Sequence, residues 1–186
     1  SVSDFSVFGK NILLKGNGFD FFGNILEIDF AEKVSSNFSE EFYVEHIKDC
    51  SKPESFWFKG FEDKSTHSFL YRPLEEKFIK PPLLVRAHSG PTSFFDGSYN
   101  PEVQYWTSKG FFVAEVNYGG SSGFGKEYRE RLNNKWGIVD SYDCNALVLE
   151  LLKLDLVDRD KVVIFGNSAG GLTALNCLSY CSIFTA

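Results

Sequence analysis

The sequence lacks several features that would place it in a common functional class. It contains no methionine, and none of its apolar runs approaches the ~20 residues that a membrane-spanning helix needs. The net charge of −6 argues against nucleic-acid binding, which requires a basic face. The four cysteines show no C-x-x-C spacing, so we expect buried, reduced thiols, which favour a cytosolic setting over a zinc or redox site.

The clearest functional signal is Gly-Asn-Ser-Ala-Gly at 166–170, between a β-branched apolar run at 161–165 and a helix-like run at 172–178. Strand, G-x-S-x-G and helix in this order are typical of the nucleophile elbow of α/β-hydrolases. We expect Ser168 to be a nucleophile on a strained turn, with elbow glycines Gly166 and Gly170 because side chains there would collide. The N–H of Ala169 is then an oxyanion donor at a helix N-terminus. A glycine-rich loop after a buried strand remains the alternative.

A second absence concerns the partners of that serine. In this fold an Asp or Glu and then a His follow the nucleophile, yet no residue after Ser168 is Asp, Glu or His. The three histidines, His46, His67 and His88, all precede it. Because a serine hydroxyl is a weak nucleophile without a base, we expect no working triad within these residues. Together with the missing methionine, this predicts an internal piece of a longer protein.

The pattern of apolar residues changes near residue 53. Before it, short strand signals at 11–14 and 23–30 and a polar loop at 35–41 predict an all-β segment and linker over 1–52. After it, strands alternate with helices, which predicts an α/β fold with a parallel sheet over 53–186. The expected strands are 55–61 and 66–71, which pair through a turn at 62–65, and 83–88, 111–117 and 161–165. The expected helices are 101–109 and 139–154.

The loop after the strand at 83–88 reads His88-Ser89-Gly90-Pro91. Because ligands bind beyond the carboxyl ends of strands in such sheets, we expect the Gly90 N–H to be the second oxyanion donor, with Ser89 as the close alternative. His88 is expected to hold this loop rather than to act as a base. The glycine-rich stretch at 119–125 has no Lys-Ser/Thr ending, which argues against a phosphate site.

The order and spacing of these pieces resemble the prolyl oligopeptidase family, in its acylaminoacyl-peptidase and dipeptidyl-peptidase branch. The resemblance covers about 53–186 and rests on PPLLV at 81–85, HSGP at 88–91, QYWTSKGF at 104–111, VNYGGSSGFG at 116–125, WGIVD at 136–140 with Asp143, LVDRDK at 156–161, and the elbow. One departure is Ser89, where the family usually has glycine.

The resemblance implies the N-terminal part of an α/β-hydrolase peptidase domain, truncated after the nucleophile helix, preceded over 1–52 by the end of a β-propeller. It also implies Ser168 as the nucleophile, Ala169 and Gly90 as oxyanion donors, an acyl-enzyme, short peptide substrates, and no metal or organic cofactor. A carboxylesterase-like hydrolase and a non-catalytic interaction protein remain alternatives. Nucleic acid and membrane are not expected as partners, and a homo-oligomer is left open.

Overall fold

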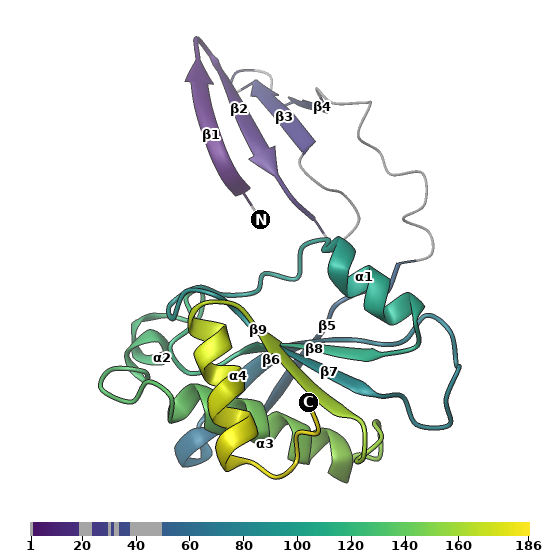
Figure 1. Ribbon diagram of the computed structural model, residues 1–186. Coiled ribbons are helices and arrows are strands. Elements are labelled where there is room, and N and C mark those ends of the chain that lie inside the picture. The colour runs from purple at the N-terminus through teal and green to yellow at the C-terminus, as the bar shows by residue number, and fades with distance from the viewer. Residues whose placement is uncertain (1, 19–23, 30, 32–33, 38–49) are drawn as a thin grey trace. The chain divides into compact units, whose positions relative to one another are not determined.

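The computed structural model describes residues 2–18, 24–29, 31, 34–37 and 50–186 and divides them into two compact units. The smaller unit comprises residues up to Cys50 together with Asp96–Pro101, and the larger comprises Ser51–Phe95 and Glu102–Ala186. The larger unit contains the G-x-S-x-G motif (Figure 1).

The smaller unit is a four-stranded antiparallel sheet in which sequential strands are neighbours. Its strands are β1 (Val2–Phe8), β2 (Asn11–Gly16), β3 (Asn24–Asp29) and β4 (Val34–Asn37). Gly9 makes the β1–β2 turn possible with a φ of 62°, a conformation that favours glycine. The expected loop at 35–41 is wrong at its start, because residues 35–37 pair with β3; the remainder lies outside the described residues.

The larger unit has a five-stranded mixed sheet in the order β5-β6-β8-β7-β9. Parallel pairing joins β7 (Leu83–Ala87) to β8 (Phe112–Asn117) on one side and to β9 (Val162–Gly166) on the other. The expectation of a parallel sheet holds only for these three strands, since β5 (Glu54–Lys59) and β6 (Ser65–Tyr71) form an antiparallel hairpin that pairs antiparallel to β8.

Helices cover both faces of this sheet (Figure 1). On one face, α3 (Val139–Lys153) and α4 (Ala169–Tyr180) pack on apolar side chains of β7, β8 and β9. On the other, α1 (Pro101–Ser108) places Val103 and Trp106 against Leu84 and Val113. The short helices are η3 (Phe61–Asp63) and α2 (Lys126–Glu130). Because β7 is buried on both faces, its sequence is apolar without alternation apart from Arg86.

β9 lies at one edge of this sheet, next to the C-terminal residues. The sequence at 182–186 predicts a strand there, but the structure assigns it no strand. It is instead joined to β9 by two backbone hydrogen bonds, Thr185 N to Val162 O and Ile164 N to Ala186 O, both 2.8 Å. Ile183 and Phe184 are buried in the core below. The outer edge of β9 is therefore partly occupied over 162–164.

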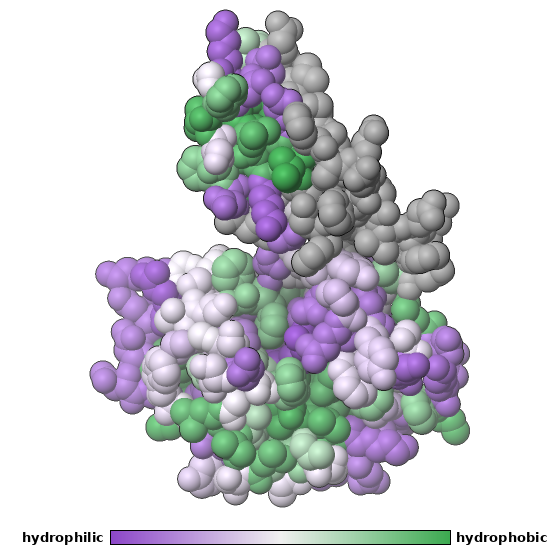
Figure 2. All heavy atoms as spheres, turned by 45° about the horizontal axis from the view of Figure 1, so that its top comes forward, coloured by the Kyte–Doolittle hydropathy of each residue, from purple (hydrophilic) through white to green (hydrophobic). Residues whose placement is uncertain are grey.

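Several large apolar side chains of the larger unit face outward (Figure 2). On α4 they are Leu172, Leu175, Leu178 and Tyr180, and on β9 the exposed one is Phe165. Cys144 and Cys177 are buried, whereas Cys50 and Cys181 are partly buried, and all four are free thiols. No helix in the described part of the chain is both long and apolar enough to cross a membrane.

Candidate active site

Ser168 occupies the turn between β9 and α4 and has φ 54° and ψ −117°. A non-glycine residue with positive φ costs of order 1–3 kcal/mol and persists only where the surrounding structure enforces it. Here the enforcement comes from β9, which is paired to β7, and from α4, whose first hydrogen bond runs from Leu172 N to Ser168 O. Ser168 is exposed, so its hydroxyl is accessible from solvent.

The glycines on either side of Ser168 are required by close backbone contacts. A Cβ on Gly166 would lie 2.2 Å from Gly170 O. A Cβ on Gly170 would lie 2.3 Å from Ala87 O and 2.8 Å from His88 O. Real Cβ contacts of this length do not occur, so a side chain at either position would force the backbone apart. The same contacts place the start of α4 directly against the carboxyl end of β7.

The two expected oxyanion donors come from these two adjoining places. Ala169 is the first residue of α4, and Gly90 follows the end of β7 by three residues. Within the described residues, neither the Ala169 N–H nor the Gly90 N–H donates to another protein group, whereas Gly170 N is bonded to Asn167 O. The helix dipole of α4 adds positive potential at its N-terminus. The structure thus brings the backbone of both donors to one edge of the sheet.

Ser89, the departure from the family pattern, does not have a positive φ. Gly90 has no left-handed φ either, and a Cβ on it would make ordinary contact with Ser93 Cβ at 3.4 Å. The loop therefore adopts a conformation that L-residues tolerate, and serine at position 89 imposes no backbone strain on it.

His88 is buried, and both of its ring nitrogens have partners. Nδ1 lies 2.9 Å from Gly90 O and 3.1 Å from Tyr118 Oη, and Nε2 lies 2.7 Å from Ser121 Oγ. The ring also stacks on Tyr118 with centroids 4.1 Å apart. Burial lowers the pKa of His88 to about 4, so the ring is neutral at pH 7. Its geometry is that of a side chain that holds the loop, as the sequence predicts.

Ser168 has no base among its described neighbours. In the part of the chain that the structure describes, its hydroxyl forms no hydrogen bond with a histidine or a carboxylate. His67 is likewise buried, with Nε2 3.0 Å from Ser55 Oγ and its pKa lowered by burial to about 4. The described histidines, carboxylates and thiols form no cluster suited to a metal ion.

Two buried aspartates on α3, to which the sequence assigns no role, fix the elements around the elbow. Asp140 accepts a 2.6 Å hydrogen bond from Thr173 Oγ1 on α4. Asp143 accepts from Gly119 N and from Phe61 N, both at 2.7 Å. Burial raises the pKa of Asp143 to about 6, against the effect of these two N–H donors. In the sequence, both belong to the pieces that carry the family resemblance, and both lie in the first turns of α3 among apolar residues.

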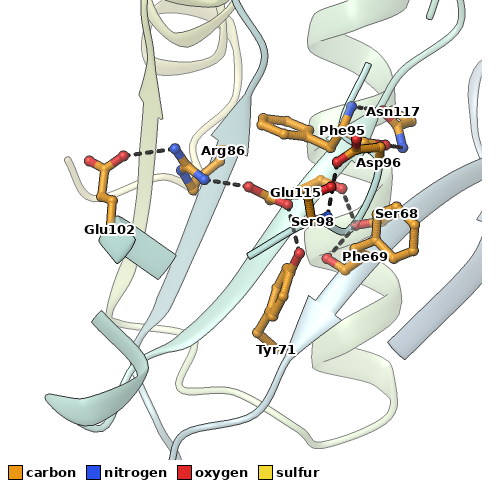
Figure 3. A network of polar contacts seen from close by, with 10 residues as sticks. All are labelled: Ser68, Phe69, Tyr71, Arg86, Phe95, Asp96, Ser98, Glu102, Glu115 and Asn117. Atoms are coloured by element: carbon orange, nitrogen blue, oxygen red, sulfur yellow. Dashed lines mark hydrogen bonds and ion pairs between the residues drawn. The ribbon is translucent and has the colours of Figure 1, made fainter. Parts of the chain in front are cut away.

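A buried charged network lies on the opposite face of the sheet (Figure 3). Arg86 is paired with Glu115, its neighbour across β7 and β8, and reaches Glu102 at 2.7 Å. Tyr71 donates to Glu115 at 2.9 Å. The Arg86 guanidinium also lies over the Phe95 ring, 5.5 Å from its centroid. Each charge thus has a partner, as burial requires.

Glycines at 119 and 120 serve packing rather than a ligand. A Cβ on Gly119 would lie 2.8 Å from Val139 Cγ1, and one on Gly120 would lie 2.6 Å from Leu132 Cβ. The two glycines let the segment after β8 lie against α3 and the turn that precedes it.

The profile of the prolyl oligopeptidase family matches residues 97–186, which include the elbow and most of the elements that hold it. The chain belongs to this family. The family's acylamino-acid-releasing enzyme 2 from Oryza sativa subsp. japonica is 38% identical over 92 residues, covering 50% of this chain and 12% of the relative. Dipeptidyl aminopeptidase BIII from Pseudoxanthomonas mexicana is 33% identical over 102 residues, covering 53% of this chain and 14% of the relative.

Solved structures of this prolyl oligopeptidase family superpose on nearly the whole chain. A puromycin-hydrolyzing peptidase from Mycobacterium tuberculosis aligns with a TM-score of 0.88 and 30% identity, over 97% of this chain and 29% of the other. An acylaminoacyl peptidase from Pyrococcus horikoshii, at 21% identity, shares the fold with a TM-score of 0.87 over 98% of this chain and 30% of the other. This chain therefore spans less than a third of these structures and is homologous to serine-type peptidases.

Proposed function

We propose that this chain carries the nucleophile and oxyanion parts of a serine peptidase site acting on short peptides. The observation that supports it most is the conformation of Ser168, an exposed serine held at positive φ between β9 and α4 by glycines that tolerate no Cβ. Ser168 is the nucleophile, and Ala169 N–H and Gly90 N–H are the donors that would stabilise the oxyanion. In architecture, residues 53–186 form the N-terminal part of an α/β-hydrolase domain.

The reaction is acyl transfer. Ser168 Oγ attacks the scissile carbonyl carbon as a general base takes its proton, and the C–N bond breaks as the leaving amine receives that proton. Water then attacks the ester, which releases the acid and regenerates the hydroxyl. Because the described residues place no base at Ser168, we expect this chain to hydrolyse a peptidyl-nitroanilide at a rate that Ser168→Ala does not change.

The nucleophile can be tested without a built-in base. A fluorophosphonate reacts when a serine oxygen attacks phosphorus, fluoride leaves and a base takes the proton, and added imidazole supplies that base. We expect slow labelling of Ser168 that rises with imidazole concentration, is lost in Ser168→Ala, and persists in Ser179→Ala, which removes another exposed hydroxyl, on α4. Peptide mapping of the label checks this, and labelling elsewhere but not at Ser168 would overturn the proposal.

We propose further that residues 1–52 are the last blade of a β-propeller and its exit. The four-stranded up-and-down antiparallel sheet of β1–β4 supports this, as do the exposed side chains of Phe5, Val7 and Phe8 on the outer strand β1. A single such sheet buries little apolar surface alone. Limited proteolysis should therefore cleave within 1–52 well before it cleaves within 53–186, and equal resistance of the two parts would contradict the assignment.

A further inference from the structure

Two segments that follow neighbouring strands are fastened to each other at the edge where the candidate site lies. The first is 88–95, after β7, which contains Gly90; we call it the oxyanion segment. The second is 117–122, at the end of β8 and beyond; we call it the clasp segment. β7 and β8 are parallel neighbours, so both segments leave the sheet at the same edge.

Asn117 fixes the far end of the oxyanion segment. Its Oδ1 accepts a 2.7 Å hydrogen bond from Phe95 N, and its Nδ2 donates to Phe95 O at 3.0 Å (Figure 3). One side-chain amide thus satisfies both backbone groups of Phe95, as a neighbouring strand would. Asn117 is fully buried and also contacts His67 Nδ1 at 3.1 Å.

Two consecutive serines of the clasp segment fix the near end. Ser121 Oγ is 2.7 Å from His88 Nε2. Ser122 Oγ donates to Thr92 O at 2.6 Å, and Ser122 N donates to Ser93 O at 3.2 Å. Gly90 lies between these attachments, two residues after His88 and two before Thr92.

The carbonyl of Gly90 is also held in place. It accepts hydrogen bonds from Ser93 N at 3.0 Å and from the His88 ring at 2.9 Å. His88 therefore links the clasp directly to Gly90, through Ser121 on one ring nitrogen and the Gly90 carbonyl on the other. A backbone N–H reaches an oxyanion only if the orientation of its peptide is fixed, and an error near 1 Å can cost about 10²-fold in rate.

We propose that Ser121 and Ser122 are positioning residues for the Gly90 N–H, a role that rests on the proposed function. They touch no reacting atom and act by restricting the oxyanion segment. Ser122 is the sharper test, since its hydroxyl bond lies at an exposed position and its loss should leave the core intact.

The experiment measures the imidazole-assisted rate of fluorophosphonate labelling at Ser168 in matched variants. We expect about a tenfold or greater fall in Ser122→Ala, a similar or larger fall in Ser121→Ala, and recovery in Ser122→Thr, which restores the hydroxyl. The control is Ser108→Ala, which removes an exposed hydroxyl-to-carbonyl bond of 2.7 Å on α1 and should label at the wild-type rate. Ser122→Ala should keep the wild-type unfolding midpoint while amide exchange at Ser93 and Ser122 becomes faster.

Failure of this inference differs from failure of the proposed function. If wild type is labelled at Ser168 and both alanine variants are labelled as fast as wild type, the serines do not position Gly90 and the nucleophile proposal stands. If Ser122→Thr labels as slowly as Ser122→Ala, the hydroxyl bond is not the cause and the inference is wrong. If wild type shows no label at Ser168, the nucleophile proposal fails and the positioning role fails with it.

Discussion

Gly170 is an elbow position at which the backbone leaves no space for a side chain. A Cβ there would meet two backbone carbonyl oxygens, Ala87 O at 2.3 Å and His88 O at 2.8 Å, and neither can turn away as a flexible side chain could. Gly170→Ala should therefore lower the free energy of unfolding by about 3 kcal/mol or more, by overpacking at the junction of α4 and β7. Urea denaturation followed by circular dichroism measures this.

The adjacent glycine provides the control for that prediction. A Cβ on Gly171 would lie 3.4 Å from Gly166 O, a contact that small shifts accommodate, and alanine favours the helix by up to ~1 kcal/mol. Gly171→Ala should therefore change stability by no more than ~1 kcal/mol in either direction. Equal losses in the two variants would show that helix propensity or exposure, not the contact with β7, decides the effect.

Local chemistry made the elbow predictable at this scale, because glycine spacing and the strand–helix context depend on a few consecutive residues. The partners of His88 were not predictable, since Ser121 and Tyr118 are distant in sequence and meet it only through the pairing of β7 with β8. The sequence shows Asn117 only as a polar residue at the end of a strand. Its two hydrogen bonds to Phe95 could not be predicted, because they depend on tertiary structure.

At the scale of elements, polar contacts join α4 to α3 and to the turn that precedes α3. Thr173 Oγ1 donates to Asp140 Oδ2 at 2.6 Å, and Asn176 Nδ2 donates to Gly137 O at 3.3 Å. Loss of the first bond leaves a buried carboxylate without its donor. In a double-mutant cycle of Thr173→Val and Asp140→Asn, we expect a coupling energy of about 1–3 kcal/mol.

Thr107 supplies the matched control for the cycle. It is a fully buried threonine on α1, on the other face of the sheet, whose hydroxyl donates to Gln104 O within its own helix. Thr107→Val combined with Asp140→Asn should give additive losses of stability. A coupling energy between Thr107 and Asp140 as large as that between Thr173 and Asp140 would mean that the coupling reflects a general loss of stability rather than a direct hydrogen bond.

The strands and longer helices were largely predictable because their apolar patterns are strong. The order of the strands was not, since the sequence predicts the pairing of 55–61 with 66–71 but does not state that this hairpin lies antiparallel to β8. The strand expected at 182–186 was wrong because its β-branched and aromatic residues, Ile183 and Phe184, are buried in the core while the backbone pairs irregularly with β9.

For the whole molecule, stability should rise with pH between about 4 and 6.5. His67 and His88 have pKa values lowered by burial from 6.5 to about 4, so the unfolded chain binds more protons in this window and protonation favours unfolding. Each histidine contributes on the order of 2–3 kcal/mol across the full window. Asp143, whose pKa is raised to about 6, opposes this trend, because its stabilising effect is lost as pH rises from 3.8 to 6.

The contribution of one histidine can be isolated by substitution. His88→Gln should remove roughly half of the histidine contribution to the dependence of unfolding free energy on pH, so that the remaining slope reflects His67 opposed by Asp143. Denaturant titrations at pH 4.5, 5.5 and 6.5 measure the slopes. An unchanged slope in His88→Gln would mean that His88 keeps an ordinary pKa in the folded protein.

Exposed apolar residues on α4 predict concentration-dependent self-association. Leu175 is 64% exposed, with Leu172 and Leu178 exposed one turn on either side of it. Leu175→Glu should lower the apparent mass in sedimentation at high protein concentration by breaking this apolar stripe. Leu149→Glu, at a leucine of α3 that is 50% exposed, is the control and should change it less. Equal effects of the two substitutions would contradict a role for this stripe.

Asp140 and Asp143 lie three residues apart on α3, and one fastens the helix behind the nucleophile while the other fastens the start of the clasp segment. A displacement of α3 along or about its axis would therefore shift both attachments in the same sense. The spacing between Ser168 and Gly90 would be preserved during thermal motion of that helix. Fluctuations that alter this spacing would instead have to break a buried aspartate contact, so the geometry of the site should be lost in discrete openings rather than by gradual drift.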